Sequence, residues 1–107
     1  MINLNDVAEQ AYLLAKQRQL DTDVLSTLKH CAGEVVEATE AYTKLQSTPS
    51  PNQAIALTYD TGLELADIII CALTASVKLN IDIETCINEA MQKNAKRAYQ
   101  ENNNETA

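Results

Sequence analysis

Residues 51–78, PNQAIALTYDTGLELADIIICALTASVK, constrain the fold more than any other part of the chain. They begin with a proline and contain a single glycine, Gly62, so little after the first residue interrupts a helix. A continuous α-helix of this length would be roughly 42 Å long. Its apolar residues fall on two nearly opposite sides, at Leu57, Leu65, Ile68 and Ala72 and at Leu63, Ala66, Ile70, Leu73 and Val77. This pattern predicts a central helix that other helices cover on both sides.

The other segments of the chain are also typical of helices. Only two glycines and two prolines occur in 107 residues, which leaves little room for the tight turns of an all-β fold. Helical spacing of apolar residues predicts three more helices, over about residues 5–19, 22–46 and 82–99. The expected N-caps are Asn5, Asp21 or Asp23, Ser50 with the capping-box residue Gln53, and Asp82. Short connections favour antiparallel neighbours, so we expect an all-α four-helix bundle.

One domain is expected from the length of the chain. Residues 1–99 would form this helical domain, and the polar tail QENNNETA at 100–107 would be disordered. A single copy of this size buries a modest core and hardly covers two apolar sides of one helix. We therefore expect a homodimer or a homotetramer.

The net charge of −7 limits the classes of partner. It argues against binding to a nucleic-acid polymer or to an anionic membrane surface, but allows a phosphorylated ligand when a metal ion intervenes. Cys31, Cys71 and Cys86 form no CxxC pair, so we interpret them as reduced core residues. The first residues lack the pattern of a secretory signal, and the apolar run at 68–77 is too short to span a bilayer. These features predict a cytoplasmic protein.

Acidic residues interrupt the central helix in an ordered way. Asp60, Glu64 and Asp67 share a narrow stripe with Cys71 and Thr74, at spacings of four and three residues. Carboxylates beside apolar surface are costly to bury unless a cation or a proton neutralises them. The stripe therefore indicates a site where positive charge meets the helix.

The segment HCAGEVVEATEAY, residues 30–42, carries a second pair of acids. Glu34 and Glu37 are three residues apart on one face, and His30 lies one turn before Glu34. Ala38 and Ala41 flank this face and would let another helix approach closely. If the two helices are antiparallel and these faces meet, four carboxylates converge.

Four converging carboxylates predict a site for a hard cation, Mg²⁺ or Mn²⁺, with Glu34, Glu37, Glu64 and Asp67 as ligands. A di-iron bundle would need Glu-x-x-His pairs, and the single histidine does not follow any glutamate by three residues. No Cys/His group has the spacing of zinc ligands along the chain, which argues against zinc. The simpler alternative is that Glu-x-x-Glu marks a solvated helix face.

The motif Glu34-x-x-Glu37, followed after 26 residues by Glu64-x-x-Asp67, resembles the signature of the MazG-like all-α nucleoside triphosphate pyrophosphohydrolase superfamily. The segment MQKNAKRAY at 91–99 resembles the Lys-Asn-x-x-Arg element that follows in many members. The resemblance covers roughly residues 5–99. Gly33 stands where the family usually has the first glutamate of Glu-Glu-x-x-Glu, which removes one possible outer ligand.

The resemblance implies a function and roles for particular residues. Mg²⁺ would bridge the four carboxylates and a nucleoside triphosphate, water would attack a phosphorus atom, and the products would be nucleoside monophosphate and pyrophosphate. Glu37 is the expected residue to orient or deprotonate that water. The resemblance also implies clearance of damaged or excess nucleotides, and a homodimer or homotetramer with sites near the contacts between protomers.

Basic residues are candidates for contacts with phosphate. Lys93 and Arg97 are four residues apart on one helix face, whereas Lys96 is explained by the helix dipole. Asn94 would bond a sugar or a base, or cap local structure. His30 would contact the nucleotide or fill a structural position.

Two other functions are compatible with the same acids. A non-catalytic acidic bundle would bind a divalent metal or a partner helix, and would have no need for Lys93 and Arg97. A phosphoribosyl-ATP pyrophosphohydrolase would share the metal chemistry and differ only in its substrate.

Overall fold

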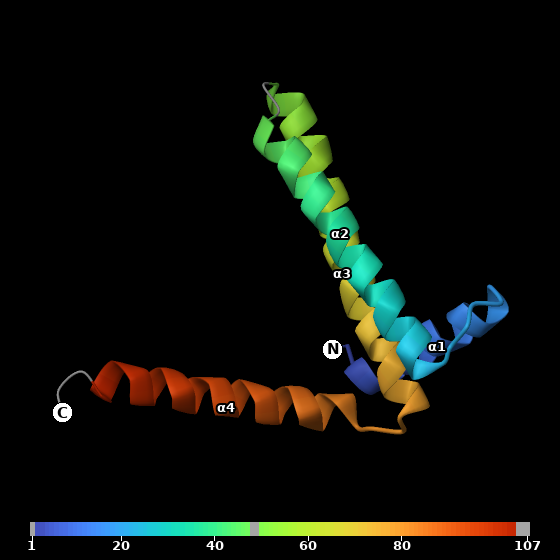
Figure 1. Ribbon diagram of the computed structural model, residues 1–107, viewed down its shortest axis with the longest axis vertical. Helices are drawn as coiled ribbons and strands as arrows, with labels where there is room; N and C mark the ends of the chain where they lie inside the picture. Colours follow the sequence, from blue (N-terminus) through green and yellow to red (C-terminus); the bar gives the residue numbers. More distant parts are fainter. Residues whose placement is uncertain (1, 48–49, 105–107) are drawn as a thin grey trace.

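The protein is all-α in a computed structural model that describes residues 2–47 and 50–104 (Figure 1). Four helices follow one another: α1 (Leu4–Gln17), α2 (Val24–Ser47), α3 (Pro51–Lys78) and α4 (Ile83–Asn104). No strand occurs in the described ranges. The prediction that the protein is all-α is therefore confirmed. Of the helices described, none combines the length and the apolar character needed to cross a membrane.

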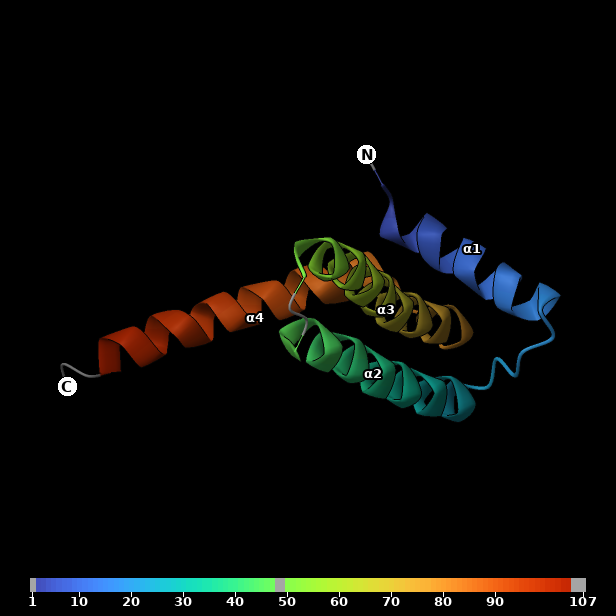
Figure 2. The same ribbon diagram turned by 90° about the horizontal axis from the view of Figure 1, so that it is seen from above.

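Helix α3 is central, as its two apolar sides predicted. It runs beside α2, and α1 packs on its other side, so that α3 lies between the two in the view from above (Figure 2). Small buried residues stand at these contacts, including Ala8 and Ala11 of α1, Ala38 of α2 and Ala75 of α3. Small side chains let helix axes approach closely, so the acidic faces of α2 and α3 come within reach of each other.

Local caps set most of the helix ends that the sequence predicted. The Ser50 hydroxyl accepts a hydrogen bond from Gln53 N at 3.4 Å, and Pro51 begins α3. The Asp82 carboxylate accepts one from Thr85 N at 3.2 Å at the start of α4. Helix α3 continues through Gly62 without a break. These caps satisfy N–H groups that have no partner inside the helix.

The predicted N-cap of α1 is wrong. Asn3, and not Asn5, caps this helix, because its Oδ1 accepts hydrogen bonds from Asn5 N at 2.9 Å and Asp6 N at 3.3 Å. The Asn5 side chain has a long-range role instead. Its Nδ2 donates to Asp82 Oδ1 at 2.9 Å, and its Oδ1 accepts from Ile83 N at 3.0 Å. The start of α1 is thereby fastened to the start of α4.

Helix α4 does not join the three packed helices along its length, which limits the predicted bundle to α1, α2 and α3. Only its first turn is held, and it then projects away from the α2–α3 pair (Figure 1). Every described side chain from Thr85 to Asn103 is exposed. The turn before α4 contains Asn80 in a left-handed conformation, with φ 57°, and this reversal sends α4 in its own direction.

The end of α4 also differs from the prediction. The helix continues past Tyr99 to Asn104, whereas residues 100–107 were expected to be disordered. Neither glycine nor proline follows Tyr99, and Asn103 Nδ2 donates to the Tyr99 carbonyl at 2.7 Å. Nothing in this sequence therefore stops the helix at Tyr99. Residues 105–107 of the expected tail lie outside the described residues.

Large apolar side chains remain exposed on the single chain. On α4, Ile87, Met91 and Tyr99 are 38%, 65% and 70% exposed. On α3, Ile55 and Ile69 are exposed as well. An exposed set of this kind is typical of a surface that contacts another molecule.

Candidate metal centre

The acidic faces of α2 and α3 meet near the middle of both helices. Glu34, Glu37 and Glu64 each offer a carboxylate oxygen, and these oxygens lie within 4.8 Å of one another. Glu34 and Glu37 share a face because they are three residues apart on α2, and Glu64 comes from α3. Three of the four predicted ligands are thus brought together.

Asp67 lies beside this group without belonging to the closest set. Its charge raises the pKa of both Glu34 and Glu64, which places it in their electrostatic neighbourhood. Asp67 and Glu34 also line the same cavity. The fourth predicted ligand is therefore adjacent to the other three, one turn along α3 from Glu64.

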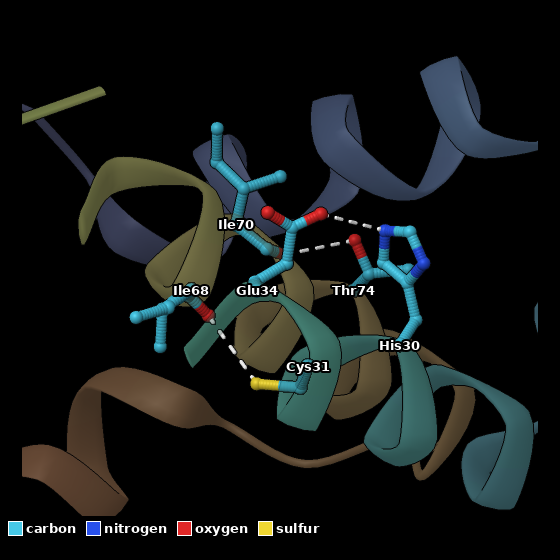
Figure 3. A network of polar contacts seen from close by, with 6 residues as sticks. All are labelled: His30, Cys31, Glu34, Ile68, Ile70 and Thr74. Carbon is cyan, nitrogen blue, oxygen red and sulfur yellow. Dashed lines mark hydrogen bonds and ion pairs between the residues drawn. The ribbon is translucent and has the colours of Figure 1, made fainter. Parts of the chain in front are cut away.

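Glu34 is largely enclosed by its neighbours. Its side chain is 12% exposed, and its Oε1 lies 3.0 Å from His30 Nε2 (Figure 3). Burial raises the pKa of Glu34, and the charges of Glu37 and Asp67 raise it further, while His30 acts in the opposite direction. Its Oε2 is buried and has no hydrogen-bond partner among the described residues.

Glu64 has a similar environment on the facing helix. Burial raises the pKa of this carboxyl, and the nearby charges of Glu37, Glu34 and Asp67 raise it as well. Glu64 Oε2 is also buried, and no described residue forms a hydrogen bond with it. A buried acceptor without a partner is costly, because it has lost its bonds to water without replacing them.

The donor set fits a hard divalent cation. It consists of carboxylate oxygens, which Mg²⁺ and Mn²⁺ prefer, and two of the same glutamates, Glu34 and Glu64, each have a buried oxygen without a hydrogen-bond partner among the described residues. Mutual repulsion of the carboxylates is relieved by a cation at their centre. Glu34, Glu37 and Glu64 would hold such an ion, with Asp67 next to them.

A cavity of about 550 Å³ adjoins the carboxylates. Helices α1, α2 and α3 and the α1–α2 connection form its walls, with Leu14 and Ile70 among the apolar residues. His30, Glu34 and Asp67 lie on its wall as well. The cavity is therefore apolar in part and acidic where it meets the metal-ligand candidates, a combination typical of sites for small molecules.

A second group of donors was missed in the sequence. His30, Glu34 and Cys71 offer ligand atoms that lie within 4.8 Å of one another. Spacing along the chain does not reveal this group, because its ligand atoms come from two helices, α2 and α3. The available signals were the four-residue spacing of His30 and Glu34 and the place of Cys71 in the acidic stripe.

The three cysteines are free, and their environments differ. Cys31 is half-buried, and its thiol donates to the Ile68 carbonyl at 3.7 Å (Figure 3). Cys86 is exposed on α4, so the prediction that it is a core residue is wrong. Burial raises the pKa of Cys71 to about 11, and the neighbouring Cys31, Glu34 and Asp67 contribute.

The predicted phosphate-binding residues are not near the carboxylates of their own chain. Lys93, Asn94 and Arg97, all described, lie on the exposed length of α4, which points away from α2 and α3 (Figure 1). His30, by contrast, stands directly beside Glu34. A scan against protein-family models found no match to this chain, and searches of curated proteins and of solved structures found none either.

Proposed function

We propose that the protein is a Mg²⁺- or Mn²⁺-dependent nucleoside triphosphate pyrophosphohydrolase that clears unwanted nucleotides in the cytoplasm. One observation carries the proposal: two helices bring carboxylates together so closely that Glu34 Oε2 and Glu64 Oε2 are buried without hydrogen-bond partners. A protein rarely keeps such a costly arrangement outside a functional site. The short motifs that resemble the MazG-like superfamily include these same residues.

The chemistry of phosphoryl transfer suits an acidic site that holds metal. It depends on positioning and on neutralising charge more than on covalent help from side chains. A bound Mg²⁺ or Mn²⁺ would supply that neutralisation and hold the triphosphate. Glu34, Glu37 and Glu64 would bind the ion, and Asp67 would complete or support the set.

Glu37 is the best candidate for handling the attacking water. Of the three glutamates whose oxygens lie closest together, only Glu37 is exposed, so water reaches it more easily than it reaches Glu34 or Glu64. Its carboxylate would accept the proton as the water oxygen bonds to the α-phosphorus. The bond from that phosphorus to the bridging oxygen breaks, and pyrophosphate leaves with the electron pair.

The adjoining cavity would take the nucleoside. Its volume of about 550 Å³ lies in the range of pockets for small molecules. Because Glu34 and Asp67 stand on its wall, a nucleoside inside it would direct the triphosphate towards the carboxylates. His30 would then contact the nucleotide at the junction of the two regions.

The basic residues would reach the site from a second copy of the chain. Helix α4 carries Lys93 and Arg97 away from its own acidic site, and it exposes Ile87 and Met91, which gain from being covered. The acidic α2–α3 face of another copy offers the opposite charge. A homodimer, or a homotetramer built from such dimers, would satisfy both requirements.

A non-catalytic metal-binding protein is the second candidate. The observation that favours it is the position of Lys93 and Arg97, which lie away from the carboxylates within one chain (Figure 1). Such a protein would bind Mg²⁺ through the same glutamates and release no pyrophosphate from any nucleotide. The two candidates therefore differ in one measurable product.

The test is a direct assay of pyrophosphate. Purified protein is incubated with each ribo- and deoxyribonucleoside triphosphate, with Mg²⁺, with Mn²⁺ or with a chelator, and pyrophosphate and monophosphate are quantified. Glu37→Gln and Asp67→Asn are compared with Glu9→Gln, which makes the same chemical change at an exposed position of α1. Metal-dependent release that both site variants abolish and Glu9→Gln retains supports the enzyme.

The opposite result is equally informative. If folded protein binds Mg²⁺ and yields no pyrophosphate from any nucleoside triphosphate, the proposed activity is rejected. Phosphoribosyl-ATP is then the remaining substrate for the same chemistry. Failure with that compound as well leaves the non-catalytic metal-binding protein.

A further inference from the structure

A mixed group of ligand atoms lies at the boundary between the acidic cluster and the cavity. His30 and Glu34 are four residues apart on α2, and Cys71 approaches them from α3. One nitrogen, one oxygen and one sulfur donor lie within 4.8 Å of one another. All three residues also line the cavity.

The chemistry of these donors differs from that of the carboxylate group. Thiolate and imidazole ligands select borderline or soft cations such as Zn²⁺, whereas Mg²⁺ and Mn²⁺ prefer oxygen. Zinc ligands stand about 2.0–2.3 Å from the metal, so donors that are already within 4.8 Å need only small side-chain adjustments to bind one ion. Three protein ligands would leave a fourth position facing the cavity.

The environment of Glu34 within this group favours a positive charge nearby. Glu34 Oε2 is buried and has no hydrogen-bond partner among the described residues, although Oε1 of the same carboxylate contacts His30. A divalent cation at this point would give that oxygen a partner, and the neighbouring His30 and Cys71 ligand atoms lie within 4.8 Å.

We propose that His30, Glu34 and Cys71 form a binding site for one Zn²⁺ ion. This site differs from the carboxylate site because it has a nitrogen and a sulfur donor, and it shares only Glu34 with it. On binding, the Cys71 proton is released to solvent, and His30 exchanges its contact with Glu34 Oε1 for a bond to the metal. Because Glu34 belongs to both groups, Zn²⁺ competes with Mg²⁺ for this carboxylate. The inference goes beyond the proposed function, since metal binding requires no turnover.

Cobalt substitution tests the site on the full-length protein. Co²⁺ occupies zinc sites, and a cysteine ligand gives it a thiolate-to-metal charge-transfer absorption that oxygen ligands do not produce. We expect this absorption in the wild type, its loss on addition of Zn²⁺, and its absence in Cys71→Ser. Cys86→Ser is the matched control, because Cys86 is exposed on α4 and should leave the absorption unchanged.

Competition with a chromophoric chelator then measures the affinity for Zn²⁺. Loss of one ligand in Cys71→Ser or in His30→Gln should weaken Zn²⁺ binding by at least about tenfold. Mg²⁺ binding should persist in Cys71→Ser, because the carboxylate oxygens remain. His30 is 58% exposed, so its substitution tests the site at a position where folding is not at stake.

Specific results would overturn the site. The assignment fails if the wild type gives no charge-transfer absorption, or if the absorption survives in Cys71→Ser. It also fails if Cys86→Ser removes the absorption, or if His30→Gln binds Zn²⁺ as tightly as the wild type. Circular dichroism of each variant confirms that its helices are intact. None of these readings depends on hydrolysis of a nucleotide, so they stand apart from the test of the proposed enzyme.

Discussion

Asn5 Nδ2 donates a hydrogen bond to Asp82 Oδ1 at 2.9 Å, across 77 positions of the sequence. The same side chain accepts from Ile83 N at 3.0 Å, so a single asparagine joins the first turns of α1 and α4. Leu4 N, next to it, donates to Glu84 Oε1 at 2.7 Å. The direction in which α4 leaves the packed helices is therefore set at one small junction.

Removing this junction should destabilise the protein. In Asn5→Ala, loss of the part-buried bond from Ile83 N alone should lower the free energy of unfolding by about 1 kcal/mol. Urea denaturation monitored by circular dichroism measures the change. Asn88→Ala is the matched control, an exposed asparagine in the body of α4, and should lose no stability. Equal stability of the Asn5 variant and the wild type would contradict a structural role for Asn5.

The acidic cluster should make the metal-free protein more stable as pH falls below neutral. The pKa values of Glu34 and Glu64 are raised above the ordinary 4.5, so the folded protein binds more protons than the unfolded chain in this window. The free energy of unfolding therefore rises as pH falls from neutral towards 4.5. Equivalently, this contribution is lost as pH is raised through the folded-state pKa values. Urea midpoints in chelator-treated buffer measure this slope.

Glu34→Gln and Glu64→Gln provide the check on that explanation. Each replaces one half-buried carboxylate with a neutral amide of nearly the same shape, so the dependence of stability on pH above 4.5 should become shallower. If the dependence of stability on pH is the same in both variants as in the wild type, other titratable groups cause it. Below pH 4.5 the dependence of stability on pH reverses. Hydrogen bonds from Asn5 and Thr85 lower the pKa of Asp82, so the stability that this cap contributes is lost as pH falls through the lowered pKa.

Mg²⁺ should stabilise the folded protein through the same carboxylates. A ligand that binds only the folded state raises the free energy of unfolding by about 2.7 kcal/mol at 100 times its Kd. We expect Tm to rise with the Mg²⁺ concentration and to return to the starting value with chelator. The double variant Glu34→Gln/Glu64→Gln should lose this response, whereas Glu9→Gln should retain it. A Tm that Mg²⁺ leaves unchanged would argue against the carboxylate site.

Mixing two inactive variants tests whether Arg97 acts on the site of a second copy. Glu37→Gln removes an acid of the α2–α3 face, and Arg97→Ala removes a cation of α4. In a two-fold dimer, half of the randomly mixed dimers contain both variants, and each of those has one intact site, so activity should recover to about a quarter of wild type.

A site built entirely within one chain predicts no recovery of activity in the mixture. If each site takes its acids and its Arg97 from one chain, no mixed dimer contains an intact site and the mixture stays inactive. The control is a mixture of Glu37→Gln with Asp67→Asn, two variants of the same acidic face. That mixture should show no recovery under either arrangement, because both substitutions fall on the surface that one chain supplies.

The sequence predicted the helices well where their ends depend on neighbouring residues. Ser50, Pro51 and Gln53 lie within four positions of one another, and α3 begins at Pro51 as expected. The meeting of Glu34 and Glu37 with Glu64 was also predictable, because three-residue spacing fixes a helix face and the short connection makes α2 and α3 neighbours.

Other features depend on contacts that local patterns do not contain. The bond from Ile83 N to Asn5 Oδ1 spans 78 positions, so neither the role of Asn5 nor the direction of α4 could be read from spacing. The group of His30, Glu34 and Cys71 likewise requires the relative rotation of two helices. Packing of small residues such as Ala38 sets that rotation, and no linear motif encodes it.

Helix α4 is held at its first turn by the contacts of Asn5 and Asp82, so a small tilt there moves the far part of the helix by a larger distance. Arg97 stands about 21 Å along the helix from Ile83, at 1.5 Å for each residue. A tilt of about 10° in the first turn would therefore displace Arg97 by about 4 Å, more than the length of a hydrogen bond. Contacts at the first turn alone therefore do not fix the position of the Arg97 guanidinium precisely. In the proposed assembly, contacts with the neighbouring copy hold α4 in position. Weak association of the copies would therefore lower activity even with all four carboxylates unchanged.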